Sequence, residues 1–145
     1  MFKVFLDANV IADTYDENRH TCLESQKALT TLLNNPSIEL FTSCDIITTL
    51  YYILSKKGKA DALDIIIQVN EICTVIDFAN KEILESCLLM KADLKYKDLE
   101  DTIQYVMAKK VGVDLILSND KGFVSGDIEL LTTPNFNLIY PKGKK

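Results

Sequence analysis

The sequence predicts an α/β fold in which helices cover both faces of a mainly parallel sheet. Two observations support this prediction. Apolar, β-favouring runs alternate along the chain with longer segments of helical periodicity. The runs 2–6 and 113–117 each lead directly into a polar tip, Asp7-Ala8-Asn9 and Ser118-Asn119-Asp120. Because ligands of such sheets bind beyond the carboxyl ends of the strands, two strands that finish on acids suggest one metal site.

Each expected strand is a short run of branched, aromatic or other apolar residues. The predicted strands cover residues 2–6, 38–41, 73–76, 115–117 and 128–131. The predicted helices cover residues 9–12, 18–34, 59–70, 80–91 and 99–111, with one more running from a cap at Thr42 or Ser43 to about Lys57. Pro36, Gly58 and Gly112 follow helix ends. One domain over residues 1–140 is expected, followed by a flexible basic tail at 141–145.

The composition is that of an ordinary globular chain, with 48% hydrophobic and 26% charged residues. No apolar stretch approaches the roughly 20 residues that a membrane helix needs, and the N-terminus lacks a secretory signal. A cytoplasmic protein without membrane contact is therefore expected. In that compartment the four dispersed cysteines, with no CxxC pair, are interpreted as small apolar residues rather than as disulfides.

The net charge of −5 argues against a simple nucleic-acid binder, since phosphate affinity comes from clustered lysine and arginine. The lysines nevertheless gather in groups, at 56–59, 91–97, 109–110 and 142–145. Two interpretations stay open. The groups are solvated helix ends, or they flank an acidic pocket in which a cation helps to hold a phosphodiester.

Three aspartates are the strongest candidates for metal ligands: Asp7, Asp101 and Asp120. Two follow strands, and Asp101 opens a helix whose next turns carry Tyr105 and Ala108, which should bury that helix against the sheet. Magnesium prefers carboxylate oxygens together with water and substrate phosphates. Acids in a first helical turn also have a purely structural explanation, because they complement the helix dipole.

Other polar residues near these acids have competing interpretations. The Asn9 amide can orient the Asp7 carboxylate, or Asn9 is an ordinary helix cap, and Ser118 can support Asp120 through its hydroxyl. Helix capping is favoured for Asp98 and Glu100. Asp13 and Asp16 are interpreted as surface charges or outer acids near the site, and His20 as a surface or helix-start residue. Gly-rich phosphate loops are absent.

Three segments together resemble the PIN-domain family, and within it the small single-domain VapC-like toxins. They are FLDANV, TSCDIITTLYYILSKK and LEDTIQYVMAKKVGVDLILSNDKGF, and the resemblance spans roughly residues 2–136. It implies a three-layer α/β/α sandwich with a sheet of four to five strands. It also implies a Mg²⁺- or Mn²⁺-dependent ribonuclease, with Asp7, Asp101 and Asp120 as catalytic metal acids and with Asn9 and Ser118 supporting them.

One position departs from the family pattern. The glutamate that usually follows the second strand corresponds to Thr49, or to Thr48 if the register slips by one residue. Its loss should weaken metal binding or leave one cation where two bind. Asp45 lies one helical turn earlier on the same face and is a candidate substitute. Glu100 or Asp45 is also a candidate acceptor for the attacking water.

The favoured function is metal-assisted hydrolysis of RNA phosphodiester bonds by the toxin of a toxin–antitoxin pair. The resemblance implies an antitoxin partner and a homodimer. Two alternatives stay open. One is a degenerate PIN-like domain that binds RNA or a protein without cleavage. The other is phosphoryl chemistry at a strand-tip aspartate, as in haloacid-dehalogenase-like phosphatases, although these usually carry a second acid where this chain has Asn9.

Overall fold

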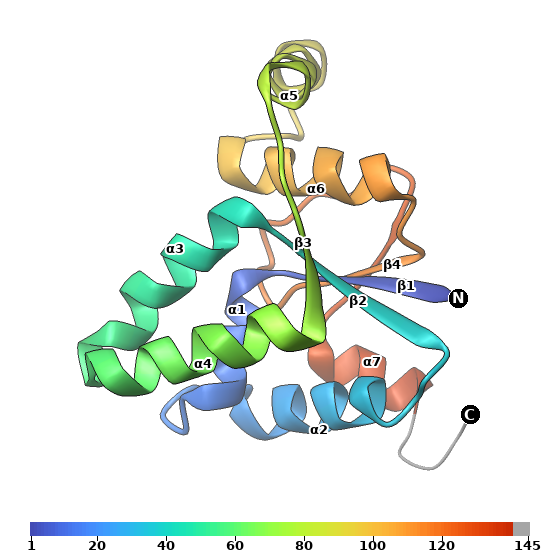
Figure 1. The fold of residues 1–145 in the computed structure, drawn as a ribbon. Coiled ribbons are helices and arrows are strands. Elements are labelled where there is room, and N and C mark those ends of the chain that lie inside the picture. The colour runs from blue at the N-terminus through green and yellow to red at the C-terminus, as the bar shows by residue number, and fades with distance from the viewer. Residues whose placement is uncertain (141–145) are drawn as a thin grey trace.

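The computed structural model describes residues 1–140, and the tail predicted at 141–145 lies outside the described residues. Its centre is a five-stranded parallel sheet with the order β3-β2-β1-β4-β5 (Figure 1). The strands are β1 (Phe2–Leu6), β2 (Ile38–Ser43), β3 (Cys73–Ile76), β4 (Leu115–Leu117) and β5 (Glu129–Leu131). The chain moves outward from β1 on one side and returns to β1 through β4 on the other. The carboxyl ends of β1 and β4 therefore flank the topological switch point, where open α/β sheets bind ligands.

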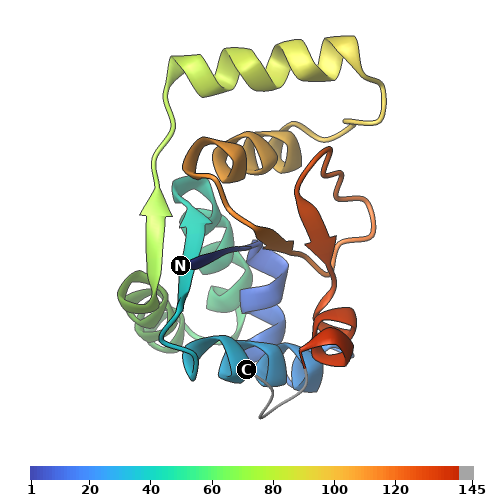
Figure 2. The same cartoon turned by 90° about the vertical axis from the view of Figure 1, so that its right-hand side faces the viewer.

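Helices cover both faces of the sheet, which confirms the three-layer prediction (Figure 2). They are α1 (Ala8–Tyr15), α2 (Cys22–Leu33), α3 (Cys44–Leu54), α4 (Lys59–Ile72), α5 (Asn80–Ala92), α6 (Leu99–Val111) and α7 (Thr133–Ile139), with a 3-10 turn at Ser55–Lys57. Among the described residues, no helix combines the length and the hydropathy needed to cross a bilayer.

The alternating side chains of β1 divide the core in two. Val4 and Leu6 pack with α1, α2, α4 and α7, whereas Phe5 packs on the other face with the buried side of α6, which includes Met107 and Ala108. Burial of Tyr105 and Ala108 agrees with the expectation for α6. Helix α5 lies on the outer side of α6, as Figures 1 and 2 both show. The strand tips are thus held by a core on each side of the sheet.

Three details differ from the sequence prediction. Helix α2 begins at Cys22 instead of residue 18, because Asp16 accepts a hydrogen bond from the Asn18 N–H at 3.0 Å and holds that segment in turns. The Ser43 hydroxyl donates to the Asp45 carboxylate and does not cap α3. Helix α7 was missed, although Thr132 caps it and a proline lies in its first turn.

Gly112 ends α6 in the left-handed conformation, with a φ of 69°. We expect Gly112→Ala to lower the free energy of unfolding by about 1 kcal/mol, because a Cβ is strained at this φ although the space around it is open. Urea denaturation measures the difference. Gly112→Asn should cost less, since asparagine tolerates this conformation better. Equal losses for the two variants would contradict the conformational explanation.

Candidate active site

The candidate site lies at the switch point between β1 and β4. Asp7 directly follows β1, and its backbone N–H donates to the Leu117 carbonyl at 3.0 Å, which ties the two strand ends together. Ser118 and Asp120 follow β4. Helix α6 brings Asp101 to the same region in its first turn. The parallel sheet therefore brings Asp7 to the same region as Asp101 and Asp120, which lie near the other end of the chain.

Asp7 is the most firmly held of these acids. It is only 4% exposed and accepts hydrogen bonds from the Ala8 N–H at 2.7 Å, from Asn9 Nδ2 at 3.0 Å and from Ser118 Oγ at 2.7 Å. The bond from Ala8 also makes Asp7 the N-cap of α1. Asn9 therefore orients the carboxylate as one interpretation expected, and the alternative that Asn9 is itself the cap is wrong.

Ser118 supports a different residue from the one expected. Its hydroxyl donates to Asp7 and accepts a 3.1 Å bond from the Asp120 backbone N–H, and within residues 1–140 it forms no hydrogen bond with the Asp120 carboxylate. That carboxylate instead accepts from the Gly122 N–H at 2.8 Å. Asn9 Oδ1 accepts from the Asn119 N–H at 2.9 Å, so Asn9 and Ser118 hold the two strand tips together.

Asp101 opens α6 beside a separate capping residue. The Asp98 carboxylate accepts from the Asp101 N–H at 2.9 Å, which confirms the structural interpretation of Asp98. No side-chain hydrogen bond engages the Asp101 carboxylate within residues 1–140. Its oxygens are thus available to a ligand.

Burial and like charge destabilise the ionised form of two of these acids. Burial raises the pKa of Asp7 to about 6, with smaller contributions from Asp120 and Glu100, against the lowering effect of the bonds from Ser118 and Ala8. Burial, followed by the charges of Asp7, Asp98 and Asp120, raises the pKa of Asp101 to about 7. The carboxylates therefore lie close enough to repel one another, a condition that a bound cation relieves.

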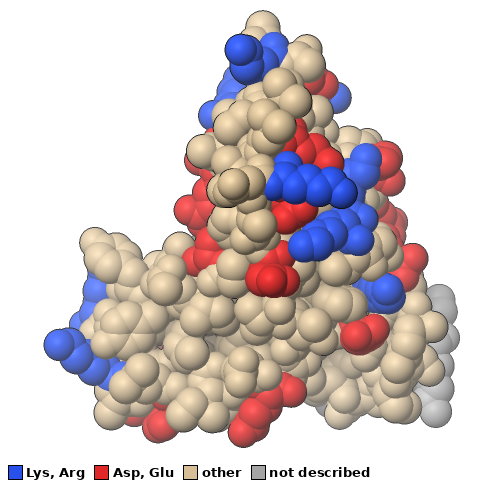
Figure 3. All heavy atoms as spheres, turned by 45° about the horizontal axis from the view of Figure 1, so that its top comes forward, with Lys and Arg blue, Asp and Glu red and all other residues tan. Residues whose placement is uncertain are grey.

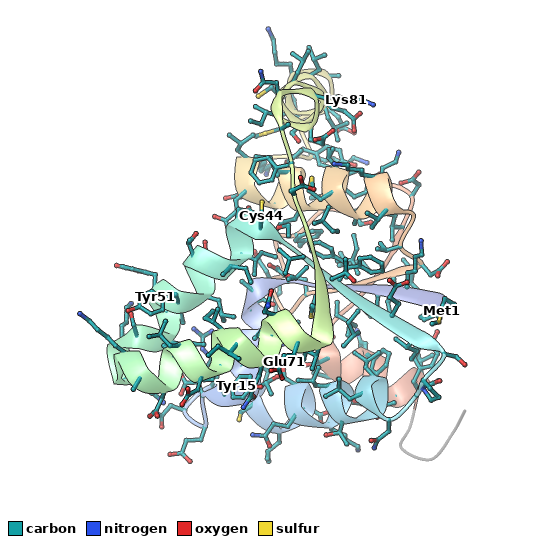
Figure 4. The ribbon with its side chains drawn as sticks, viewed as in Figure 1. Met1, Tyr15, Cys44, Tyr51, Glu71 and Lys81 are labelled. Atoms are coloured by element: carbon teal, nitrogen blue, oxygen red, sulfur yellow. The ribbon has the colours of Figure 1, made fainter. Side chains whose placement is uncertain are left out.

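The sequence also proposed Asp45, Glu100 and Thr49 as supporting residues. Figure 4 labels Cys44, which begins α3 and directly precedes Asp45. Burial and the negative charges of Asp45 and Asp98 raise the pKa of Glu100, so Asp45 and Glu100 are near enough to repel one another. Thr49 lies one turn further along α3 and is partly exposed. Glu100 also raises the pKa of Asp7 and Asp101 through its charge, whereas position 49 carries no carboxylate.

A hard divalent cation fits the donor chemistry of the site. Carboxylate oxygens are its preferred ligands, and within residues 1–140 no lysine or arginine forms an ion pair with Asp7, Asp101 or Asp120. The described residues contain no group of three acids, cysteines or histidines already arranged to hold a metal ion. Asp7 is buried and held by hydrogen bonds, whereas Asp120 is exposed. Binding of one cation by both carboxylates therefore requires the Asp120 side chain to move.

A polar network around Asn119, which the sequence interpretation did not identify, lies beside the site. Asp13 is only 4% exposed, so of its two interpretations the surface charge is wrong and the outer acid near the site agrees with the structure. Its carboxylate accepts from Arg19 Nη1 at 3.0 Å and from Asn119 Nδ2 at 2.9 Å. Asn119 in turn accepts from the Thr133 N–H at 2.9 Å. The available signal was Asn119 itself, a polar residue inside the strand-end tripeptide. His20 is exposed just before α2, as expected.

Residues 4–128 match the family model described as the PIN domain, and the chain belongs to this family. It is also 52% identical over 134 residues to Ribonuclease VapC1 from Aquifex aeolicus (strain VF5), with 92% of each sequence covered.

Two solved structures share the fold at low sequence identity. One is VapC20 from Mycobacterium tuberculosis, described as a sarcin–ricin loop cleaving toxin, with a TM-score of 0.68 and 14% identity over 85% of this chain and 98% of that one. The other is VapBC2 from Rickettsia felis bound to a DNA fragment from its promoter, with a TM-score of 0.67 and 15% identity over 90% and 98%. At these identities the likeness establishes the fold.

Proposed function

We propose that this protein is a metal-dependent endoribonuclease that hydrolyses RNA phosphodiester bonds as the toxin of a toxin–antitoxin pair. The observation that carries the proposal is the buried, oriented Asp7 at the switch point. The charges of Asp7, Asp101 and Asp120 act on one another there, with no compensating cationic side chain among residues 1–140. The extensive identity to Ribonuclease VapC1 supports the same reaction class.

In this proposal Asp7, Asp101 and Asp120 hold Mg²⁺ or Mn²⁺, directly or through water. The bound cation supplies an acidified water and charge stabilisation at the scissile phosphate. Asn9 and Ser118 orient the Asp7 carboxylate, since both donate to its Oδ2 atom. Glu100 or Asp45 would accept the proton that the attacking water gives up. The partly exposed Thr49 leaves α3 with one carboxylate fewer than the family pattern. The number of bound cations, one or two, depends on this replacement of the usual glutamate by Thr49.

The charge distribution is compatible with an RNA substrate. In the view of Figure 3, basic side chains lie among acidic ones over the upper part of the molecule, and the lower part is mostly uncharged with a basic group at its left edge and a few acidic side chains. Long-range electrostatic attraction of RNA by a basic surface is therefore weak. The bound cation and local contacts must instead bind the phosphates. Side chains more than half exposed on α4 and α5, including Ile67 and Leu84, offer apolar surface for the antitoxin and for a homodimer. A cytoplasmic location remains a prediction.

Cleavage of single-stranded RNA by the purified chain, with Mn²⁺ or Mg²⁺ and with EDTA, tests the proposal. We expect endonucleolytic products with either metal and none with EDTA, because the acids alone cannot compensate the charge of the transition state. Addition of the partner expressed from a neighbouring gene should suppress cleavage. Undiminished cleavage in EDTA would contradict metal dependence.

The second candidate is a PIN-like domain that binds RNA or protein without cutting. The specific observation in its favour is Thr49, which leaves no carboxylate at the family's usual glutamate position. RNA binding without products at millimolar Mn²⁺ would support this candidate and reject the first.

A further inference from the structure

A polar pocket of about 320 Å³ lies beside the candidate active site. Its lining residues come from α1, the turns that precede α2 and the loop after β4, and they are Asn9, Asp13, Asn18, Arg19, His20, Thr21 and Asn119. Arg19 and His20 are the only arginine and the only histidine in the sequence. The turns at 16–21, which replace the expected start of α2, therefore place both of these side chains at one cavity.

Buried Asp13 anchors the pocket wall. Its carboxylate pairs with Arg19 at 3.0 Å and also accepts from the Thr21 hydroxyl and from Asn119 Nδ2. Asp16 is paired with Lys57 at 2.6 Å and with Arg19 Nε at 3.5 Å. Two cationic side chains therefore compensate the two acids. A polyanion is repelled less here than at Asp7, Asp101 and Asp120, which form no ion pair within residues 1–140.

The pocket wall retains uncommitted hydrogen-bonding groups. A guanidinium has five N–H donors, and the ion pairs of Arg19 engage two of its nitrogens, Nη1 and Nε. The exposed side chains of Asn18 and His20 have no hydrogen-bond partner within residues 1–140, where only the Asn18 backbone is bonded. Amide groups both donate and accept, and imidazole and guanidinium planes stack on nucleobases.

Asn9 connects this pocket to the catalytic acids. Its Nδ2 atom donates to Asp7, and its Oδ1 atom accepts from the Asn119 N–H, while Asn119 also bonds to Asp13. The Asn9 side chain thus lines the cavity and also contacts Asp7 of the proposed metal site. A chain molecule held at the acids would therefore meet the pocket on the other side of Asn9.

We propose that this pocket binds the nucleobase of a nucleotide flanking the scissile phosphate in single-stranded RNA, and so contributes to cleavage-site preference. The inference rests on the proposed ribonuclease function and names a subsite of its substrate. The volume suits a single base-sized group at the lower end of ligand pockets. Asn18 and His20 contact the base edge and face, and Arg19, held by Asp13, supplies a further stacking plane.

Binding is tested with fluorescently labelled 10-mers of A, C, G and U, measured by anisotropy in Mg²⁺. The protein is the full chain carrying Asp101→Asn, which prevents cleavage and has no hydrogen bond to the pocket. We expect His20→Ala and Asn18→Ala each to weaken binding of the preferred 10-mer by about 5-fold or more, the effect of losing one base contact. The order of preference among the four RNAs should also change.

Asn70→Ala is the matched control, because Asn70 is an exposed asparagine in the last turn of α4 and lies outside the pocket lining. Affinities within 2-fold of this control, with an unchanged order of preference, would overturn the inference, as would failure to bind any of the four RNAs. Cleavage by the chain without Asp101→Asn is assayed separately. Pocket-dependent binding with no cleavage would reject the ribonuclease function and retain the subsite.

Discussion

Replacing Asp7 with asparagine is expected to reduce RNA cleavage by about 10²–10³-fold while the protein stays folded. The carboxylate is 4% exposed and receives three hydrogen bonds that fix its position. Asparagine keeps the shape and can still accept the Ala8 bond, but it removes the negative charge that a divalent cation needs. Initial rates of oligonucleotide cleavage in Mg²⁺ measure the loss, and circular dichroism verifies the fold.

Asp64→Asn is the matched control, since Asp64 is exposed on α4 and forms no ion pair within residues 1–140. It makes the same chemical change away from the strand tips and should leave the rate unaltered. If Asp7→Asn cleaved RNA as fast as this control, the assignment of Asp7 as a metal ligand would be wrong, and with it the proposed site.

We expect Asp101→Asn to reduce RNA cleavage about as much as Asp7→Asn does. We also expect this substitution to raise the free energy of unfolding of the protein when no metal is added. Burial and neighbouring acids raise the pKa of Asp101 to about 7, from an ordinary value of 3.8. The folded chain therefore holds this proton more tightly than the unfolded chain does. The contribution of this proton to the free energy of unfolding is fully present below about pH 4. It is lost progressively as the pH rises to about 7, where the folded chain also releases the proton. Asparagine cannot ionise, so the variant does not lose this part of the free energy of unfolding at high pH.

The expected gain in the free energy of unfolding is about 1–2 kcal/mol at pH 8, a value reduced because Asp101 is only half-buried. Urea denaturation in EDTA at pH 5.5 and pH 8 measures it, and the gain should be smaller at the lower pH. Saturating Mn²⁺ should stabilise the unsubstituted chain more than the variant. A variant less stable than the unsubstituted chain at pH 8 in EDTA would show that Asp101 is not under electrostatic strain.

Local patterns in the sequence were sufficient for the fold and for the choice of acids near the site. The run 2–6 is continuous and apolar because β1 is covered on both faces, with Val4 and Leu6 in one core and Phe5 in the other. Strand β4 is buried throughout in the same way, whereas the edge strands β3 and β5 are partly exposed and were found from their short β-favouring runs. Helix α7 was missed because a seven-residue helix gives too few turns for a periodic signal, although its Thr132 cap and proline were visible.

Side-chain partners could not be predicted in the same way. Ser118 follows β4 and precedes Asp120 by two residues, so local reasoning assigned it to Asp120. In the folded chain it donates to Asp7, which is 111 residues away in sequence. The same holds for Asp13, which looks like a surface charge on a short helix but is buried against Asn119, 106 residues further on.

The sequence by itself determined the alternation of strands and helices and the acids that end β1 and begin α6, because these depend on the chemistry of neighbouring residues. Only the tertiary structure decided which groups orient Asp7, that its pKa rises to about 6, and that Arg19 and His20 line a pocket beside it. Hydrogen bonding, burial and charge repulsion depend on distances in space. The parallel order of the sheet sets those distances by bringing together segments more than 100 residues apart.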